Sequence, residues 1–409
     1  MINRNYLQCL TCGTKAMTRT AIGHSDRQEF AFPCFGCGVE IRFAMKLDQS
    51  APSFSYEWIK GAEWVHEPTL PDLENIHYLD GENLIPKDMK GNFSPFIVTS
   101  FLPEDPVDYL RGRDVRFFTS QQVWTKLKEL RVHAERRNAA LFDKLVREFK
   151  YEGALDDWED RLRAELWAIE IYGNWFRPFT SSGEAFIRQR INLAESTAGS
   201  DLHNLTTELS ASHNHQALFG ECQRVRNAFA QLYPALSSLY QVFYWRDGSA
   251  SLDDYQLAEK RFAELKTLYI DCFETFCRIS VIAATLEGEI QTGAVVVPKS
   301  KGTITVAQFQ TMNNGSKPDI LKNLPLADLF VPFINSKLRN GVGHNSAGYD
   351  VKSDEIFYSN HSNKGTTHHR LSYIRFCETI VLIYRQFELV WLYAAWLIAR
   401  AEGVKGRLV

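Results

Sequence analysis

Apolar residues recur every three or four positions along most of the chain beyond residue 119. This period places them on one face of a helix, so the pattern predicts a mainly α protein. The clearest example runs from Trp158 to Tyr172 and ends at Gly173, with Pro178 beyond it. Further helical patterns cover residues 119–149, 184–211, 215–245, 251–290 and 326–338.

Local signals refine three of these helices. Ser251 and Asp254 resemble a capping box, with Asp in place of the usual Glu or Gln, and predict that a helix begins there. Pro332 costs its helix a hydrogen bond or kinks it. The segment RVRNAF, residues 224–229, has an Arg-Asn pair without a histidine and is interpreted as the surface of a helix.

The front of the chain has a different pattern. Residues 39–47, VEIRFAMKL, alternate between apolar and polar positions, as a strand does. Residues 51–118 are rich in Pro, Asp, Asn and Trp and sustain no period. We therefore expect a small β segment over residues 1–50 and an irregular connecting region over residues 51–118.

Four of the eight cysteines lie in the β segment, spaced C-x2-C-x21-C-x2-C. Two thiolates two residues apart can bind one ion from a tight turn, and the glycine after each pair, Gly13 or Gly38, lets backbone amides approach the sulfurs. Four thiolates are the set that structural Zn²⁺ prefers, and such a closed site is not catalytic. The pattern predicts a zinc ribbon, with an iron–sulfur cluster or two disulfides as alternatives. The predicted ligands are Cys9, Cys12, Cys34 and Cys37.

Composition and charge narrow the class of protein. The chain has 409 residues, 45% of them hydrophobic, and a net charge of −3, which argues against a histone-like nucleic-acid coat. The start of the chain has no secretory h-region. The apolar run Leu389–Ala399 is shorter than the roughly 20 residues that span a bilayer. We expect a cytoplasmic protein without a membrane span, in which this run is a buried helix or part of a subunit interface.

The stretch LRNGVGHNSAGYD, residues 338–350, contains the most specific candidate chemistry. Arg339, Asn340 and His344 form R-N-x-x-x-H, directly after an amphipathic helical pattern. Residues 349–360 then read as a short hairpin, and a long apolar helix follows. Six arginines in the chain precede Asn, Asp or His, and only Arg339 has a histidine in range.

This motif resembles the signature of the HEPN superfamily of helical ribonucleases. That signature is an arginine, a polar residue directly after it, and a histidine with four to six residues between it and the arginine. The order of helix, motif, small excursion and closing helix is similar to that of many HEPN domains. The resemblance covers residues 215–409, which implies a HEPN-like helical bundle there and an additional helical region over residues 119–214.

The resemblance implies a metal-independent endoribonuclease acting on tRNA, rRNA or mRNA. It also implies a homodimer with one composite cleft, and a role as a toxin or an abortive-infection effector against phage, controlled by an inhibitor or a phage-derived trigger. Some HEPN toxins have a tyrosine two residues after the histidine as a target of an antitoxin. Ser346 occupies that position here, so that route of regulation is not expected.

The residue types fit the implied chemistry. RNA supplies its own nucleophile, the 2′-OH, and a histidine can take up a proton or return one to the leaving oxygen. An arginine can bind the phosphate and stabilise its developing charge, and Asn340 can orient the histidine. Residues five apart on a straight helix point about 140° away from each other, so we expect the helix to end or deform near Asn340. Gly341 and Gly343 permit this.

Other interpretations stay open. An Asn-Gly helix end followed by a polar loop is common in proteins without catalytic function. A non-catalytic adaptor that binds nucleic acid or protein is the second hypothesis, and a DNA-directed zinc-ribbon regulator is the third. His368 and His369 are candidates for RNA contacts beside the motif. Residues 126–150 have eight Lys/Arg against four Asp/Glu and form either an RNA contact or a solvated helix face.

Overall fold

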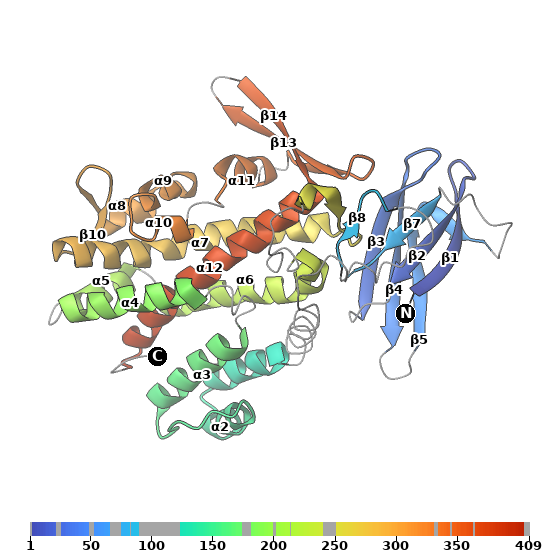
Figure 1. Ribbon diagram of the computed structural model, residues 1–409. Helices are drawn as coiled ribbons and strands as arrows, with labels where there is room; N and C mark the ends of the chain where they lie inside the picture. The colour runs from blue at the N-terminus through green and yellow to red at the C-terminus, as the bar shows by residue number, and fades with distance from the viewer. Residues whose placement is uncertain are drawn as a thin grey trace. The chain divides into compact units, whose positions relative to one another are not determined.

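The computed structural model describes residues 2–21, 26–48, 53–65, 75–81, 83–89, 123–173, 181–198, 202–212, 214–239, 251–330, 334–343, 346–362 and 365–404 (Figure 1). The chain forms two compact units, each built from three segments. The first contains Met1–Phe117, Gln231–Thr267 and Lys337–Val381. The second contains Phe118–Ala230, Leu268–Ser336 and Leu382–Val409.

Two sheets, made mostly of antiparallel strand pairs, form the N-terminal segment of the first unit. Four strands, in the order β6-β1-β2-β7, make one sheet, and β3-β4-β5 make the other. The ring of the fully buried Phe43 in β4 lies 5.6 Å from that of Trp64 in β6, so the two sheets share one core. The strands are β1 (Ile2–Cys9), β2 (Lys15–Ala21), β3 (Arg27–Pro33), β4 (Glu40–Asp48), β5 (Ser53–Lys60), β6 (Ala62–Trp64) and β7 (Ile76–Leu79).

The β structure extends beyond residue 50, which corrects the expectation of an irregular region over residues 51–118. Strands β5, β6, β7 and β8 (Ile85–Pro86) lie within that range. In β5 the aromatic residues at positions 54, 56 and 58 alternate with polar residues, and Tyr56 and Trp58 pack against Phe43. That alternation was present in the sequence and was masked by the Pro- and Asp-rich composition around it. Residues 66–74, 82 and 90–118 lie outside the described residues.

The middle segment of the first unit joins the N-terminal sheets. Strand β9 (Tyr255–Gln256) pairs with β8, and Glu259 forms a bridge with Phe30 of β3. Ser251 caps a 3-10 turn, Leu252–Asp254, by accepting a hydrogen bond from the Asp253 amide, and helix α7 (Phe262–Thr292) begins later. The predicted helix start at Ser251 is therefore wrong, because residues 255–256 are used in strand pairing.

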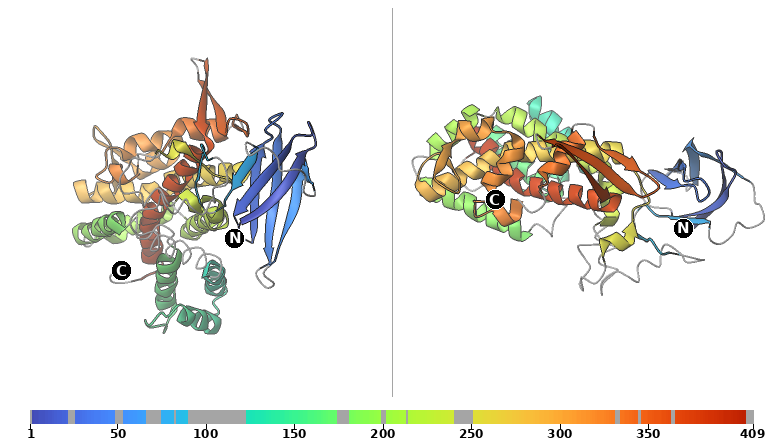
Figure 2. Two further views of the ribbon diagram at one scale, coloured as in Figure 1. Left: turned by 45° about the vertical axis from the view of Figure 1, so that its right-hand side comes forward. Right: turned by 90° about the horizontal axis from the view of Figure 1, so that it is seen from above.

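The last segment of the first unit forms a three-stranded sheet before the closing helix. Strands β12 (Gly348–Asp350) and β13 (Glu355–Ser362) form the predicted hairpin, and β14 (Gly365–Ser372) adds a third strand. Strands β13 and β14 project outward from the first turn of α12 (Tyr373–Ala401), as Figure 1 and Figure 2 show. The ion pair of Lys260 with Asp354, 2.6 Å long, fixes the turn before β13 to the middle segment.

The second unit is helical, which confirms the mainly α fold. Helix α3 (Trp158–Gly173) covers the predicted helix, and its end at Gly173 stays a prediction because residues 174–180 lie outside the described part. The pattern over residues 119–149 divides into helical residues 123–135 and α2 (Ala139–Glu148). The other helices are α4 (Ser181–Ala198), α5 (Leu202–Ser212), α6 (His215–Leu236), α8 (Val306–Thr311), α9 (Lys317–Leu321) and α10 (Ala327–Phe330), with a 3-10 turn at Asn314–Ser316 and a ribbon of β10 (Val296–Pro298) and β11 (Thr303–Thr305).

The predicted helix over residues 326–338 is broken. It consists of α10 and of α11 (Ser336–Gly343), with residues 331–333, including Pro332, outside the described part. Residues 334 and 335, directly before α11, are not helical, so the pattern does not form one continuous helix.

A buried ion pair lies in the second unit. Arg226 of α6 is fully buried, and its Nε lies 3.1 Å from Glu388 of α12. The interpretation of residues 224–229 as a helix surface is therefore wrong for Arg226. Within the described residues, α12 is the one helix long and apolar enough to cross a bilayer, and 78% of its most apolar window is buried inside the protein.

Candidate metal centre and catalytic motif

The four N-terminal cysteines come together at one point of the first unit. Their sulfur atoms all lie within 4.8 Å of one another, with Cys9 3.8 Å from Cys37 and Cys12 3.6 Å from Cys34. Four thiolates about 2.3 Å from a tetrahedral ion lie about 3.8 Å apart, so the cluster has the spacing for one metal ion. A disulfide needs about 2.05 Å, so the spacing does not fit the disulfide alternative.

The two cysteine turns have the same backbone structure. In the first, the Cys9 amide donates to Thr14 O and the Gly13 amide to Cys9 O. In the second, the Cys34 amide donates to Val39 O and the Gly38 amide to Cys34 O. Both glycines have a φ of 72°, in the left-handed region that favours glycine. The sequence repeat C-x2-C-G therefore specifies two equivalent turns that face each other.

Hydrogen bonds favour the thiolate form of Cys12 and Cys34, whereas burial and the neighbouring cysteines raise the pKa of Cys37. The Thr14 side chain lies 3.1 Å from Cys12 Sγ, and its hydrogen bond lowers the pKa of Cys12 to about 6. The Gly36 amide donates to Cys34 Sγ at 3.4 Å. The donor set, its spacing and these bonds fit a thiolate-ligated metal ion. The other four cysteines, Cys222, Cys272, Cys277 and Cys377, are buried, as expected.

The motif at residues 339–344 lies at the C-terminal end of α11. Leu338, Gly341 and Val342 are buried, whereas Arg339 is half-buried and Asn340 is exposed. Arg339 Nη1 donates to Asn340 Oδ1 at 3.1 Å. Residues 340–343 are helical, so the expectation that the helix ends near Asn340 is wrong. His344 and Asn345 lie outside the described residues.

The chain on both sides of His344 is held to the hairpin. The Ser346 hydroxyl lies 2.8 Å from the carbonyl oxygen of Gly341 and 2.9 Å from that of Ser359 on β13. This hydroxyl therefore joins the last described turn of α11 to strand β13.

The hairpin places two other histidines, His368 and His369, near Ser346. His368 Nδ1 lies 2.8 Å from Ser359 Oγ, and Ser359 is also the partner of Ser346. The ring of His369 stacks on Tyr358 with centroids 5.0 Å apart. His368 is exposed and His369 half-buried. The position of His368 and His369 in the sequence suggested that they lie near the motif. The structural cause is the strand register, in which His368 lies opposite Ser359.

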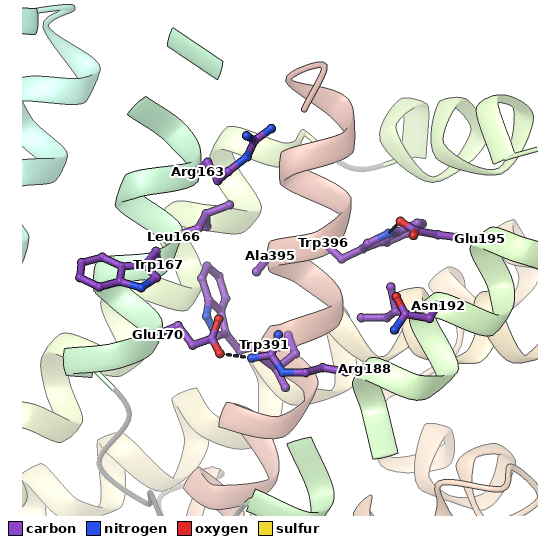
Figure 3. A pocket seen from close by; sticks show the side chains of 12 residues that line it. Arg163, Leu166, Trp167, Glu170, Arg188, Asn192, Glu195, Trp391, Ala395 and Trp396 are labelled. Carbon is purple, nitrogen blue, oxygen red and sulfur yellow. Dashed lines mark hydrogen bonds and ion pairs between the residues drawn. The ribbon is translucent and has the colours of Figure 1, made fainter. Parts of the chain in front are cut away.

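Two cavities in the second unit contain charged groups that are paired. One, of about 160 Å³, is lined by Trp167, Trp391 and Trp396, with Arg188 bonded to Glu170, as Figure 3 shows. The other, of about 460 Å³, contains Arg131 3.3 Å from Glu165. Burial raises the pKa of Glu165 to about 7. His215 of the same cavity lies 3.0 Å from Glu402.

No protein-family model, no curated protein and no solved structure matches the chain. The function is therefore inferred from the cysteine cluster, the motif at residues 339–344 and their surroundings.

Proposed function

We propose that the chain is an endoribonuclease whose catalytic residues are Arg339, Asn340 and His344 and which needs no metal for catalysis. The observation that carries the proposal is the Ser346 hydroxyl 2.8 Å from Gly341 O. It ties Ser346, two residues after His344, to the last turn of α11. The proposal requires His344 to turn back toward Arg339, because residues five apart on a straight helix point away from each other. The HEPN-like sequence motif supplies the reaction class.

The roles follow from the chemistry of each group. His344 takes the proton from the 2′-OH or returns one to the leaving 5′-oxygen. Arg339 binds the scissile phosphate and stabilises the charge that develops on it. Asn340, hydrogen-bonded to Arg339, orients the guanidinium or the phosphate. The 2′-oxygen forms a bond to phosphorus as the 5′-oxygen leaves, so the product has a 2′,3′-cyclic phosphate.

We further propose that the four-cysteine cluster holds a structural Zn²⁺ ion. The sulfur spacing near 3.8 Å and the all-thiolate donor set support this choice. All four coordination positions are taken by protein thiolates, so the ion would stabilise the fold of the first unit. An iron ion has the same spacing, and elemental analysis of protein expressed with both metals separates the two.

In cells the proposed enzyme acts as a homodimer and as a toxin or anti-phage effector, as the motif resemblance implies. Arrest of growth on expression, dependent on His344, supports this role. Sedimentation of the purified protein measures its oligomeric state.

Binding without cleavage is the second candidate function. The outward face of β13 and β14 favours it, since Phe357 is 50% exposed and Arg370 and His368 are exposed beside it. Such a face can contact nucleic acid through stacking and phosphate pairing without acid–base chemistry.

The test is cleavage of total tRNA and rRNA with EDTA present. Wild type is compared with His344→Ala and Arg339→Ala, and with two controls at exposed positions, His203→Ala and Arg224→Ala. We expect the first two variants to lose at least about 100-fold in rate, in line with the contribution of general acid–base catalysis. We expect the controls to retain activity and the ends to be cyclic phosphates. Equal cleavage by wild type and His344→Ala contradicts the assignment, and RNA binding without cleavage supports the second candidate.

A further inference from the structure

A cavity of about 320 Å³ opens in the first unit beside the second cysteine turn. Its size is at the lower end of the range for small-ligand sites. Five sequence segments line it, within residues 31–35, 76–79, 86–89, 256–260 and 349–354. It is separate from the motif residues and from the cysteine sulfurs. Its aromatic lining includes Phe32, Phe35, His77 and Tyr349.

Three of these rings form a stack. The ring of His77 lies 4.1 Å from that of Phe32 and 4.1 Å from that of Phe35, with an interplanar angle of 24° to Phe35. Phe32 is buried, whereas Phe35 is 45% exposed. The stack therefore ends at an accessible aromatic ring. Unstacked bases of single-stranded nucleic acids bind to such rings in a sequence-tolerant way.

The middle ring of the stack has an unsatisfied polar atom. His77 Nε2 is buried and has no hydrogen-bond partner among the residues described. Burial lowers the pKa of His77 to about 3, so the imidazole is neutral and offers one donor and one acceptor. A buried polar atom without a partner costs free energy, which a ligand with a complementary edge recovers. Nucleobase edges have both donors and acceptors.

Positive charge is available next to the stack. Lys87 is exposed and lines the cavity. Lys352 is exposed, and its side chain packs against Gly38, with its Cδ 3.3 Å from the position of a Cβ there. Lys260, in contrast, is neutralised by Asp354 at 2.6 Å. Two exposed lysines beside an aromatic platform match the alternation of phosphates and bases along a single strand.

The first cysteine turn lacks these features. Leu10 occupies the position equivalent to Phe35, one residue after the first cysteine of its turn, and is 64% exposed. The two turns have the same backbone hydrogen bonds, so the aromatic ring at position 35 is not required by the metal site itself.

We propose that this cavity binds one unstacked base of a single-stranded RNA, which lies beside His77, is hydrogen-bonded to its Nε2 and contacts the exposed part of Phe35, with Lys87 and Lys352 near the flanking phosphates. This inference rests on the proposed function for the identity of the ligand as RNA. In this proposal the second cysteine turn contributes to RNA recognition as well as to the metal site.

The test measures binding to full-length protein by fluorescence anisotropy at one fixed salt concentration. The probe is a labelled eight-residue oligouridine, and every protein also has His344→Ala to prevent cleavage. We expect Phe35→Ala to raise the Kd about 5- to 150-fold and Phe35→Trp to retain binding. We expect the matched control Leu10→Ala to leave the Kd within about twofold. Metal content and Tm are measured for each variant, so that a loss of fold is recognised.

A second variant separates recognition from structure. His77→Phe keeps the ring stack and removes the unpaired nitrogen, so we expect an unchanged or higher Tm together with a several-fold higher Kd. A structural role for His77 would lower the Tm instead. Equal effects of Phe35→Ala and Leu10→Ala, or no effect of either, would overturn the proposal. Equally tight binding of the matching deoxyoligonucleotide would also overturn it, since the ligand would then be single-stranded DNA.

The proposals for the cavity and for the nuclease fail in different ways. Cleavage that depends on His344, with an unchanged Kd in Phe35→Ala, sinks the cavity proposal alone. RNA binding that depends on Phe35, without cleavage by wild type, supports the cavity and contradicts the nuclease.

Discussion

Gly341 of α11 lies directly against the aromatic ring of Tyr358 on β13. A Cβ atom at position 341 would stand 2.6 Å from Tyr358 Cδ2, closer than real Cβ contacts allow. For Gly343, two residues later, no atom of the described part of the chain lies within 4 Å of the Cβ position. The glycine at 341 is thus required for close packing of the helix end on the hairpin, and the glycine at 343 is not.

Substitution of these two glycines should therefore have opposite effects. We expect Gly341→Ala to push α11 off the hairpin, to cost about 1–3 kcal/mol through overpacking, and to reduce RNA cleavage. Gly343→Ala adds helix propensity worth up to about 1 kcal/mol and meets no neighbour. Urea unfolding and cleavage assays on both variants check this. A stable, fully active Gly341→Ala protein would show that the packing does not hold the motif.

Removal of the metal should destabilise the first unit. We expect one Zn²⁺ per chain. The ion should be lost in Cys12→Ser, because Cys12 belongs to the cluster, and retained in Cys222→Ala, because Cys222 does not. Chelation should lower the Tm, and the metal affinity should fall with pH as protons compete for the thiolates. Elemental analysis and calorimetry provide the two readouts. Full metal retention in Cys12→Ser would remove that residue from the ligand set.

Glu259 should make stability depend on pH. Burial raises its pKa to about 8, and Arg261 only partly offsets this. A carboxyl with a raised folded-state pKa binds its proton more tightly when folded, so its favourable contribution is present below about pH 4.5. That contribution is lost as the pH rises toward 8. Glu259→Gln should raise the Tm relative to wild type increasingly between pH 5 and pH 8, whereas the exposed Glu152→Gln should not. A constant difference across that range would contradict the buried, protonated state.

The buried pair of Arg226 and Glu388 should show strong coupling. Removing one partner leaves a buried charge, so Arg226→Met and Glu388→Gln should each cost about 3–5 kcal/mol. Arg226→Met combined with Glu388→Leu should cost clearly less than the sum. Denaturant unfolding of the single and double variants measures the coupling. Additive losses would mean that the two side chains act independently.

Patterns confined to neighbouring residues predicted the structure well. The C-x2-C-G repeats indicated the cysteine cluster, and the periodic apolar positions indicated α3. The hairpin after the motif was also predicted. In each case the signal and the structure lie within a few residues of one another.

Features that depend on distant partners were not visible in the sequence. Arg226 is buried because Glu388 reaches it from another helix, and Ser251 caps only a short turn because β9 pairs with β8. The aromatic stack at His77 requires β7, which pairs with β2 in one sheet, to pack against Phe32 and Phe35 at the end of β3 in the other sheet. His77 could not have been chosen from the sequence, since a single histidine in a polar segment has no local signal.

The segmented construction of the first unit has a consequence for its synthesis. Phe30 of β3 is bridged to Glu259, and Gly38 packs against Lys352. The N-terminal sheets emerge from the ribosome long before either partner exists, so the first unit cannot close until nearly the whole chain has been made. Such high contact order slows folding and leaves apolar surface exposed in the meantime. An incomplete chain would therefore carry the cysteine cluster without a closed base cavity or an anchored motif, which ties the assembly of this unit to the completion of translation.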